Sequence, residues 1–151
     1  MSDPTITLQE TSTDTLDYVE SLLDANDLPT DDLRRKPESF VIAVDGSERV
    51  GVGGVEIHGE DGLLRSVVVA EAHRGRGYGT VLCEKLERRA RASGVKRLYL
   101  LTTTAAAFFR QRGYEEIERE AAPARIQETT EFSKLCPETA TCLQKRLGDG
   151  E

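Results

Sequence analysis

The spacing of apolar and polar positions predicts a strand, a turn and a helix in the middle of the chain. Residues 63–70, LLRSVVVA, are mostly apolar and predict a buried strand. The segment RGRGYG, called here the glycine turn (residues 74–79), lies shortly after it. A helix is expected from there to Gly94, with Val81, Leu82, Leu86 and Ala90 on its apolar face. Its polar face carries two pairs at ion-pair spacing, Glu84–Arg88 and Glu87–Arg91.

Comparable patterns predict elements on either side of this segment. A helix begins at Thr13 or Asp14, either of which can cap it, and a short helix runs from Asp31 to the residue before Pro37. Asp45-Gly46 predicts the turn of a hairpin. The other expected elements are strands at 5–8, 40–44, 50–58, 97–103 and 139–147, and a short helix that is capped by Thr103 or Thr104 and ends at Gly113.

The glycine turn has the chemistry of an anion-binding site. Backbone N–H groups in the first turn of a helix have no partner within the helix, and the helix dipole adds partial positive charge there. Glycines at 75, 77 and 79 carry no Cβ, so a phosphate group can approach the main chain. Arg74 and Arg76 add positive charge and forked hydrogen-bond donors. We interpret the turn as a diphosphate site.

Two common diphosphate-binding motifs are excluded by their spacing. A P-loop requires Gly-Lys-Ser or Gly-Lys-Thr, and the sequence contains neither. A dinucleotide fingerprint requires G-x-G-x-x-G, but Thr80 stands at the third glycine position counted from Gly75. The next strand, 97–103, also ends in threonines where an acidic residue would bind a ribose hydroxyl. What remains is R-x-x-G-x-G after a valine-rich strand.

Composition narrows the class of protein only a little. The 151 residues are 38% hydrophobic and 31% charged, which predicts a single globular domain over 1–151. The formal net charge of −7 disfavours nucleic-acid binding, which needs a basic face. No apolar run approaches ~20 residues and the N-terminus lacks a signal-peptide core, so a cytoplasmic protein without a membrane segment is expected.

The motif and its surroundings resemble the GNAT superfamily of N-acetyltransferases. The resemblance rests on three segments: the valine-rich strand, R-x-x-G-x-G, and a second motif at 104–114, TAAAFFRQRGY. The resemblance implies an α/β (α+β) fold, with a mixed, mostly antiparallel sheet of six to seven strands flanked by about four helices. It also implies acetyl-CoA as co-substrate, a CoA-binding core at about 40–120, and a C-terminal insert and strand at 121–147.

The same resemblance implies cofactor-binding roles. The main chain of Val67, Val68 and Val69 would pair with pantetheine, and the N–H of Val68 would polarise the thioester carbonyl. Many members carry a tyrosine at the position of Phe109, and its hydroxyl protonates the leaving thiolate. In this chain another group or water must donate that proton, or the thiolate leaves unprotonated. Tyr78 and Tyr114 are the remaining nearby hydroxyls, and neither stands at the matching position. The other implied cofactor-binding residues are Arg74, Gly75, Arg76, Gly77, Tyr78, Gly79, Thr80, Phe108, Phe109 and Arg112.

Candidate acceptor and proton-transfer residues lie on the two central strands. Glu56 is the candidate general base, directly or through water, and it shares a strand face with His58; a solvated surface pair is the alternative. Arg65, among apolar neighbours, would meet either an acceptor carboxylate or Glu56 in a salt bridge. Alternation puts Arg65 and Ser66 on opposite faces. The other expected acceptor residues are Ser66, Thr103 and Arg125.

The C-terminal segment makes the resemblance more specific. PARIQETTEFSKLCPETATC, with LLRSVVV and LYLLTTTAAAFF, resembles the small arsenic-resistance N-acetyltransferases and shares stretches with the acetyltransferase domain of N-acetylglutamate synthases. This implies direct transfer to a small-molecule amine, an amino acid or an analogue such as an arsenical or phosphinic one. Alternatives are a protein N-terminal or lysine acetyltransferase, and a catalytically silent CoA sensor; a homodimer is allowed.

The three cysteines do not predict a disulfide framework or a metal site. An odd number in a short chain is atypical of disulfide-rich domains. Cys136 and Cys142 are six residues apart and match no zinc-ligand spacing, although a direct arsenic(III) or metal site is the alternative. Cys83 is expected to be a small buried hydrophobe. We therefore expect structural cysteines and no metal.

Overall fold

The structure is a computed structural model that describes residues 6–26, 28, 30, 33–35, 37–129, 132 and 140–147. It contains a seven-stranded sheet in the order β1-β2-β3-β4-β5-β7-β6. The strands are β1 (Thr7–Glu10), β2 (Phe40–Asp45), β3 (Glu48–His58), β4 (Asp61–Val69), β5 (Arg97–Thr102), β6 (Glu115–Ile117) and β7 (Thr141–Arg146). The α-helices in the described ranges are α1 (Thr13–Ala25), α2 (Tyr78–Ala92), α3 (Ala106–Gln111) and α4 (Ala124–Gln127).

These elements confirm the expected α/β class. The strand pairs β1–β2, β2–β3, β5–β7 and β6–β7 are antiparallel, and β4 pairs with β5 in parallel over Asp61–Leu63. Short 3₁₀ turns lie between them at η1 (Leu33–Arg35), η2 (Pro37–Ser39), η3 (Glu71–His73) and η4 (Arg119–Ala121). None of the described helices has the length and apolarity that a membrane span needs.

The chain forms two compact units, each built from two stretches. The first unit comprises Met1–Val55 and Ser66–Leu86, and the second comprises Glu56–Arg65 and Glu87–Glu151. The chain therefore passes between the units three times, inside β3, inside β4 and inside α2. The single domain expected over 1–151 stays a prediction.

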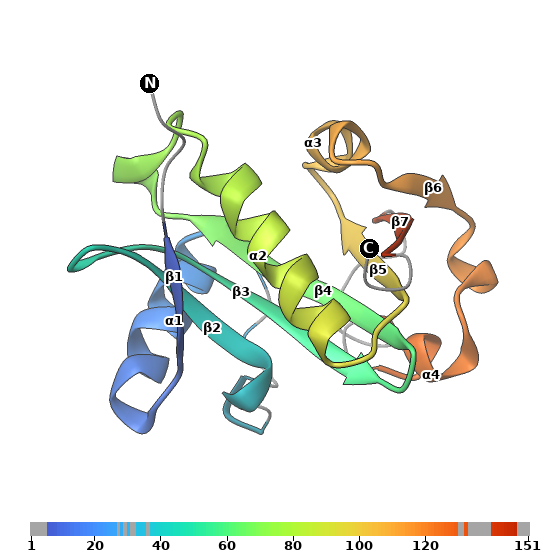
Figure 1. The fold of residues 1–151 in the computed structure, drawn as a ribbon, viewed down its shortest axis with the longest axis horizontal. Helices are drawn as coiled ribbons and strands as arrows, with labels where there is room; N and C mark the ends of the chain where they lie inside the picture. Colours follow the sequence, from blue (N-terminus) through green and yellow to red (C-terminus); the bar gives the residue numbers. More distant parts are fainter. Residues whose placement is uncertain are drawn as a thin grey trace. The chain divides into compact units, whose positions relative to one another are not determined.

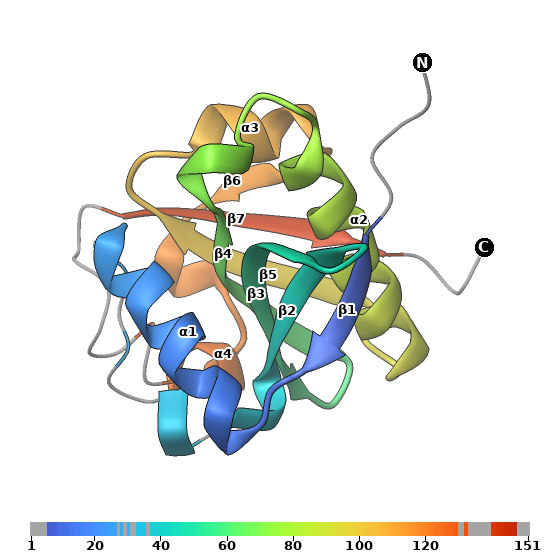
Figure 2. The same ribbon diagram turned by 90° about the vertical axis from the view of Figure 1, so that its left-hand side faces the viewer.

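The first unit has its core between α1 and the strands beside it (Figures 1 and 2). The buried face of α1 is Leu16, Val19 and Leu23, which recur at helical spacing. Burial of each such side chain contributes about 1.5–3 kcal/mol. The strand side of this core consists of Phe40, Ile42, Val44, Val52 and Val68.

Several expected boundaries in the first unit are wrong by a few residues. The N-cap of α1 is Ser12, whose N–H donates to Thr15 Oγ1 at 2.7 Å, and not Thr13 or Asp14. Asp45 pairs with Glu48, so the hairpin turn is Gly46-Ser47, with Gly46 at φ +62°. The first strand starts at Thr7, and in place of the short helix expected from Asp31 the described residues contain only the 3₁₀ turn η1.

The central strand β4 does not keep a simple two-residue alternation. Ser66 has φ +59°, a left-handed conformation that is uncommon for a residue with a Cβ. Residues 61–66 and Val68 are buried, whereas Val67 and Val69 are half-buried. Two glycines of β3 have close neighbours: a Cβ at Gly51 would lie 2.4 Å from the carbonyl oxygen of Val68, and one at Gly53 would lie 2.6 Å from Leu86 Cδ1.

The second unit has its core beside β5 and β7, which lie next to each other (Figure 1). Its buried members are Leu63, Tyr99, Ala122, Ile126, Phe132 and Cys142. Cys142 is only 3% exposed, and this burial raises the pKa of its thiol to about 11. Cys83 and Cys142 are buried thiols, while Cys136 lies outside the described residues.

Two helix interactions differ from the sequence expectation. Glu87 of α2 is buried, and its carboxylate accepts hydrogen bonds from Tyr114 and Lys145 in place of the expected pair with Arg91. Arg91 donates to the carbonyl of Leu147. The N-cap residue of α3 is Ala105, and its N–H donates to Thr102 Oγ1 at 3.0 Å. Neither Thr103 nor Thr104 is therefore the expected cap.

Candidate functional site

The glycine turn joins β4 to α2 within the first unit. Gly75 and Gly77 have φ of +81° and +84°, and the 15-residue helix α2 begins at Tyr78. A Cβ built on Gly75 would meet no atom within 4 Å. The left-handed backbone, and not crowding by the protein, therefore disfavours a side chain there, and the main chain is open to a close ligand.

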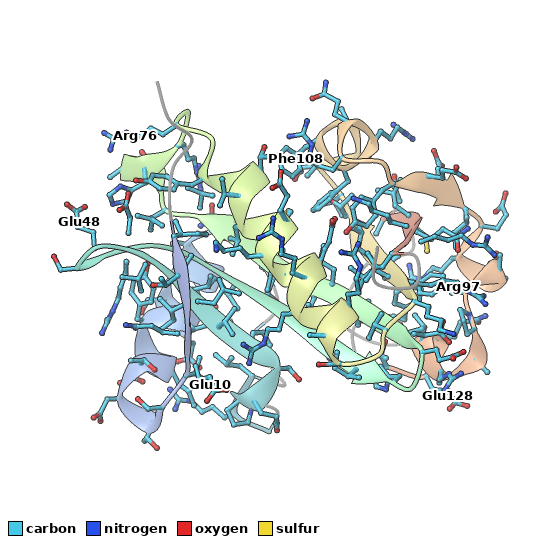
Figure 3. All side chains as sticks on the ribbon, viewed as in Figure 1. Glu10, Glu48, Arg76, Arg97, Phe108 and Glu128 are labelled. Carbon is cyan, nitrogen blue, oxygen red and sulfur yellow. The ribbon has the colours of Figure 1, made fainter. Side chains whose placement is uncertain are left out.

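Protein contacts hold this turn in place. Arg74 Nε donates to the carbonyl of Val69 at 2.9 Å, and Arg74 Nη2 donates to Asn26 Oδ1 at 2.6 Å. Asn26 caps the end of α1, and its own amide donates to the carbonyl of Leu22 at 2.9 Å. Arg74 thus ties the turn to α1 and to the end of β4. Arg76 extends from the outer end of the turn (Figure 3).

Tyr78, at the start of α2, is engaged through its hydroxyl. The Tyr78 hydroxyl donates to the carboxylate of Asp45 at the end of β2, and this hydrogen bond raises the pKa of Tyr78. The ring of His73 meets the ring of Tyr78 edge to face at 6.1 Å. Tyr78 therefore anchors the glycine turn to the β2–β3 hairpin. Neither Asp45 nor Asn26 was expected to support this turn, since each is remote from it in sequence.

In the second unit, Glu56, Arg65 and His58 form a hydrogen-bonded cluster. Arg65 Nη1 donates to Glu56 Oε2 at 2.9 Å, and His58 Nε2 lies 3.2 Å from Glu56 Oε1. The side chains of Glu56 and Arg65 are 2% and 0% exposed, whereas that of His58 is 29% exposed. The structure therefore contains the salt bridge that the sequence allowed for Arg65, and Glu56 is buried rather than solvated.

The other expected acceptor residues are distributed along the chain. Arg125 of α4 donates from Nε to Asp61 Oδ2 at 3.1 Å, and about half of its side chain is exposed. Thr103 is exposed after β5, and Ser66 is buried in β4. Arg65 therefore pairs with Glu56, whereas Arg125 pairs with Asp61 at the start of β4.

Helix α3 carries the aromatic pair of the second motif (Figure 3). Phe109 is buried and packs edge to face on Tyr114, with ring centroids 5.4 Å apart. The guanidinium of Arg112 lies 5.6 Å from the Phe108 ring centroid. The Tyr114 hydroxyl donates to Glu87 at 2.9 Å, so this hydroxyl is already used inside the protein.

Lys145 holds the end of α3 and was not expected in any site. Its Nζ donates to Glu87 Oε1 at 2.9 Å and to the carbonyl of Arg112 at 2.8 Å. It also lies 5.4 Å from the ring centroid of Tyr114. A cation at the last carbonyls of a helix is favourable. Glu87 and Lys145 are 58 residues apart in sequence, and no local pattern links them.

Comparison with protein families decides the class of this chain. The profile described as "Acetyltransferase (GNAT) family" matches residues 7–114. The chain belongs to this family. The expected GNAT resemblance and fold are therefore confirmed.

Among curated relatives, amino-acid acetyltransferases match over part of their length. The protein of Pseudomonas syringae pv. syringae is 42% identical over 65 residues, which are 43% of this chain and 15% of that protein. The protein of Pseudomonas fluorescens (strain Pf0-1) is 44% identical over 63 residues, 42% of this chain and 15% of that protein. The aligned part is thus about one-seventh of those proteins.

Solved structures share the fold over nearly the whole chain. The N-acetylglutamate synthase from Neisseria gonorrhoeae, complexed with coenzyme A and N-acetyl-glutamate, has a TM-score of 0.82 at 17% identity, covering 97% of this chain and 36% of that chain. Rv2747 from Mycobacterium tuberculosis, in complex with CoA, has a TM-score of 0.77 at 20% identity. The match covers 93% of this chain and 98% of that chain. At these identities the likeness establishes the fold.

Proposed function

We propose that this chain is an acetyl-CoA-dependent N-acetyltransferase whose acceptor is the primary amine of a small amino acid or an amino-acid analogue. The observation that carries the proposal is the glycine turn at the start of α2, inside the segment that matches the GNAT family. The amino-acid acetyltransferase relatives support the acceptor class.

The first unit supplies the contacts for acetyl-CoA. The backbone of Gly75, Gly77 and Gly79, the N–H groups of Tyr78 and Thr80, and the Arg76 guanidinium would bind the diphosphate. The open space at Gly75 fits a phosphate oxygen at the main chain. The guanidinium of Arg74 donates to Val69 and Asn26, so we assign it to holding the turn.

The family resemblance motivates the roles proposed for the rest of the molecule. Main-chain groups of Val67 to Val69 are proposed to pair with pantetheine, and the N–H of Val68 to polarise the thioester carbonyl. Phe108, Phe109 and Arg112 are proposed to flank the pantetheine chain. Phe109 has no hydroxyl to donate, and a thiol with a free pKa near ~8.5 is a tolerable leaving group without one.

The second unit supplies the groups for the acceptor. An ammonium has no lone pair, so it must lose a proton before direct attack on the thioester in a ternary complex. We place this step at the cluster of Glu56 and His58. Because the guanidinium of Arg65 is buried against Glu56, the half-exposed Arg125 is the stronger candidate for an acceptor carboxylate, with Ser66 and Thr103 as further candidates.

The decisive assay follows CoA release from acetyl-CoA against a panel of amines. The panel contains free amino acids, phosphinic and arsenical analogues of glutamate, and peptides with a free N-terminus or lysine. Turnover on carboxylate-bearing small amines, with KM raised in Arg125→Ala, is the expected result. Turnover on the peptides alone would contradict the proposed acceptor and indicate a protein acetyltransferase.

One observation favours a second function, a catalytically silent acetyl-CoA sensor. Phe109 lacks a hydroxyl, and the hydroxyls of Tyr78 and Tyr114 donate to Asp45 and Glu87. Binding of acetyl-CoA by calorimetry, together with no CoA release on any amine of the panel, would establish the sensor and overturn the acetyltransferase.

A further inference from the structure

We propose that His58 is the general base that deprotonates the acceptor amine, and that Glu56 is a positioning residue for its ring. The inference rests on the proposed N-acetyl transfer and names the residue that performs its proton-transfer step. It replaces Glu56, the residue that the sequence indicated as the base.

The burial of the cluster separates these two roles. The Glu56 side chain is 2% exposed and already meets Arg65 at 2.9 Å and His58 at 3.2 Å. An acceptor amine that arrives from solvent cannot reach a carboxylate so enclosed without displacing one of these partners. The imidazole of His58 is 29% exposed, and it is the titratable group through which the cluster reaches solvent.

The hydrogen bond fixes which nitrogen of His58 can accept a proton. An opposite charge within hydrogen-bond distance favours the ionised form of a carboxyl group, so Glu56 next to Arg65 is an acceptor. His58 Nε2 must then carry the hydrogen that it shares with Glu56. The lone pair of the neutral ring is therefore on Nδ1, which is the proton acceptor that the proposal requires.

The proton balance of the step is complete. Nδ1 of neutral His58 takes one proton from the acceptor ammonium, and Glu56 stabilises the resulting imidazolium. The nitrogen lone pair then forms the C–N bond to the acetyl carbon while the C–S bond breaks and the sulfur keeps the bonding pair. A second proton leaves the nitrogen for the sulfur, and His58 returns its proton to solvent.

The charges around His58 come from three elements. Glu56 lies on the same strand and Arg65 on β4. A Cβ on the adjoining Gly59 would lie 2.3 Å from Nη1 of Arg125 in α4, whose Nε is bound to Asp61 of β4. The guanidinium of Arg65 is thus paired with Glu56, and that of Arg125 with Asp61. Glu56 is the carboxylate that directly contacts the imidazole.

The first test is the pH dependence of kcat/KM in His58→Gln, whose side-chain amide can still donate to Glu56. Because a protonated imidazole has no lone pair to accept the proton of the amine, the wild-type profile should have an acid limb of unit slope. We expect the His58→Gln profile to lack this acid limb, and its kcat/KM to fall roughly 10²–10³-fold. His73→Gln removes the other histidine and should keep the limb.

Reciprocal results would overturn the proposal. An acid limb that persists in His58→Gln but disappears in Glu56→Gln would make Glu56 the base. Acetyl-CoA binding, measured separately, should be unchanged in His58→Gln. An absence of turnover in the wild-type protein would count against the proposed function itself.

A second measurement does not depend on turnover. Long-range nitrogen–proton NMR correlation of the wild-type protein reports the tautomer of each of its two histidines, with His73→Gln providing the assignment. We expect His58 to carry its hydrogen on Nε2 when neutral. A neutral ring protonated on Nδ1 would leave no base and would contradict the proposal.

Discussion

Single residues set the conformation on which the diphosphate site depends. Gly75 combines a φ of +81° with free space around the position of a Cβ. Gly94, at the end of α2, has φ +92° and the same free space, but it lies outside the glycine turn. Gly75 and Gly94 therefore both need a left-handed backbone conformation, but only Gly75 is proposed to contact the ligand.

Alanine at these two positions separates strain from ligand binding. We expect Gly75→Ala and Gly94→Ala each to cost about 1–2 kcal/mol of unfolding free energy, because both force an L-residue into a left-handed conformation. Only Gly75→Ala should also raise the Kd for acetyl-CoA, roughly tenfold or more, because a hydrogen bond to a charged phosphate is worth about 1.5–3 kcal/mol. Urea unfolding and calorimetric titration measure the two effects. Equal Kd values in both variants would contradict a phosphate site at this turn.

At the scale of elements, helix α3 is held in place by a partly buried ion pair. Lys145 of β7 reaches both Glu87 of α2 and the last carbonyl of α3, Arg112. Tyr114 adds a hydrogen bond to the same carboxylate. The position of Phe108 and Phe109 thus depends on a residue of the last strand.

A double-mutant cycle tests this fastening. Lys145→Met leaves the Glu87 carboxylate buried without its cation and should cost about 3 kcal/mol of unfolding free energy. Adding Glu87→Gln should recover part of this loss, because the uncompensated charge is removed. Urea unfolding of the two single variants and the double variant gives the coupling. Strictly additive losses would mean that the pair does not act together.

The elements also mark how far the sequence could be interpreted. The strand, glycine turn and α2 could be predicted because their determinants are local: apolar runs, glycines and helical spacing. The Glu56–Arg65 contact could be proposed because the two residues lie nine positions apart on successive predicted strands. Lys145 with Glu87 and Arg74 with Asn26 could not, because 58 and 48 residues separate them. Ser66 gave no warning of its left-handed φ, since serine, unlike glycine or asparagine, is not typical of that region.

At the scale of the whole molecule, alkaline pH should weaken the fold through Cys142. Burial raises the pKa of this thiol from its ordinary 9.0 to about 11 in the folded protein. A raised folded pKa stabilises the protein below pH 9, and that contribution is lost as pH rises toward 11, because only the unfolded chain ionises easily. Urea unfolding at pH 8 and pH 10 should show a smaller decline in Cys142→Ala than in wild type. An equal decline in both would assign the effect to other groups.

The division of the chain into two interleaved units has a consequence for gene architecture. Each unit needs two separate stretches, with boundaries after residues 55, 65 and 86. No single cut in the coding sequence can release either unit whole. A split or shuffled gene would therefore have to exchange both stretches of a unit together, with breakpoints inside β3, β4 and α2.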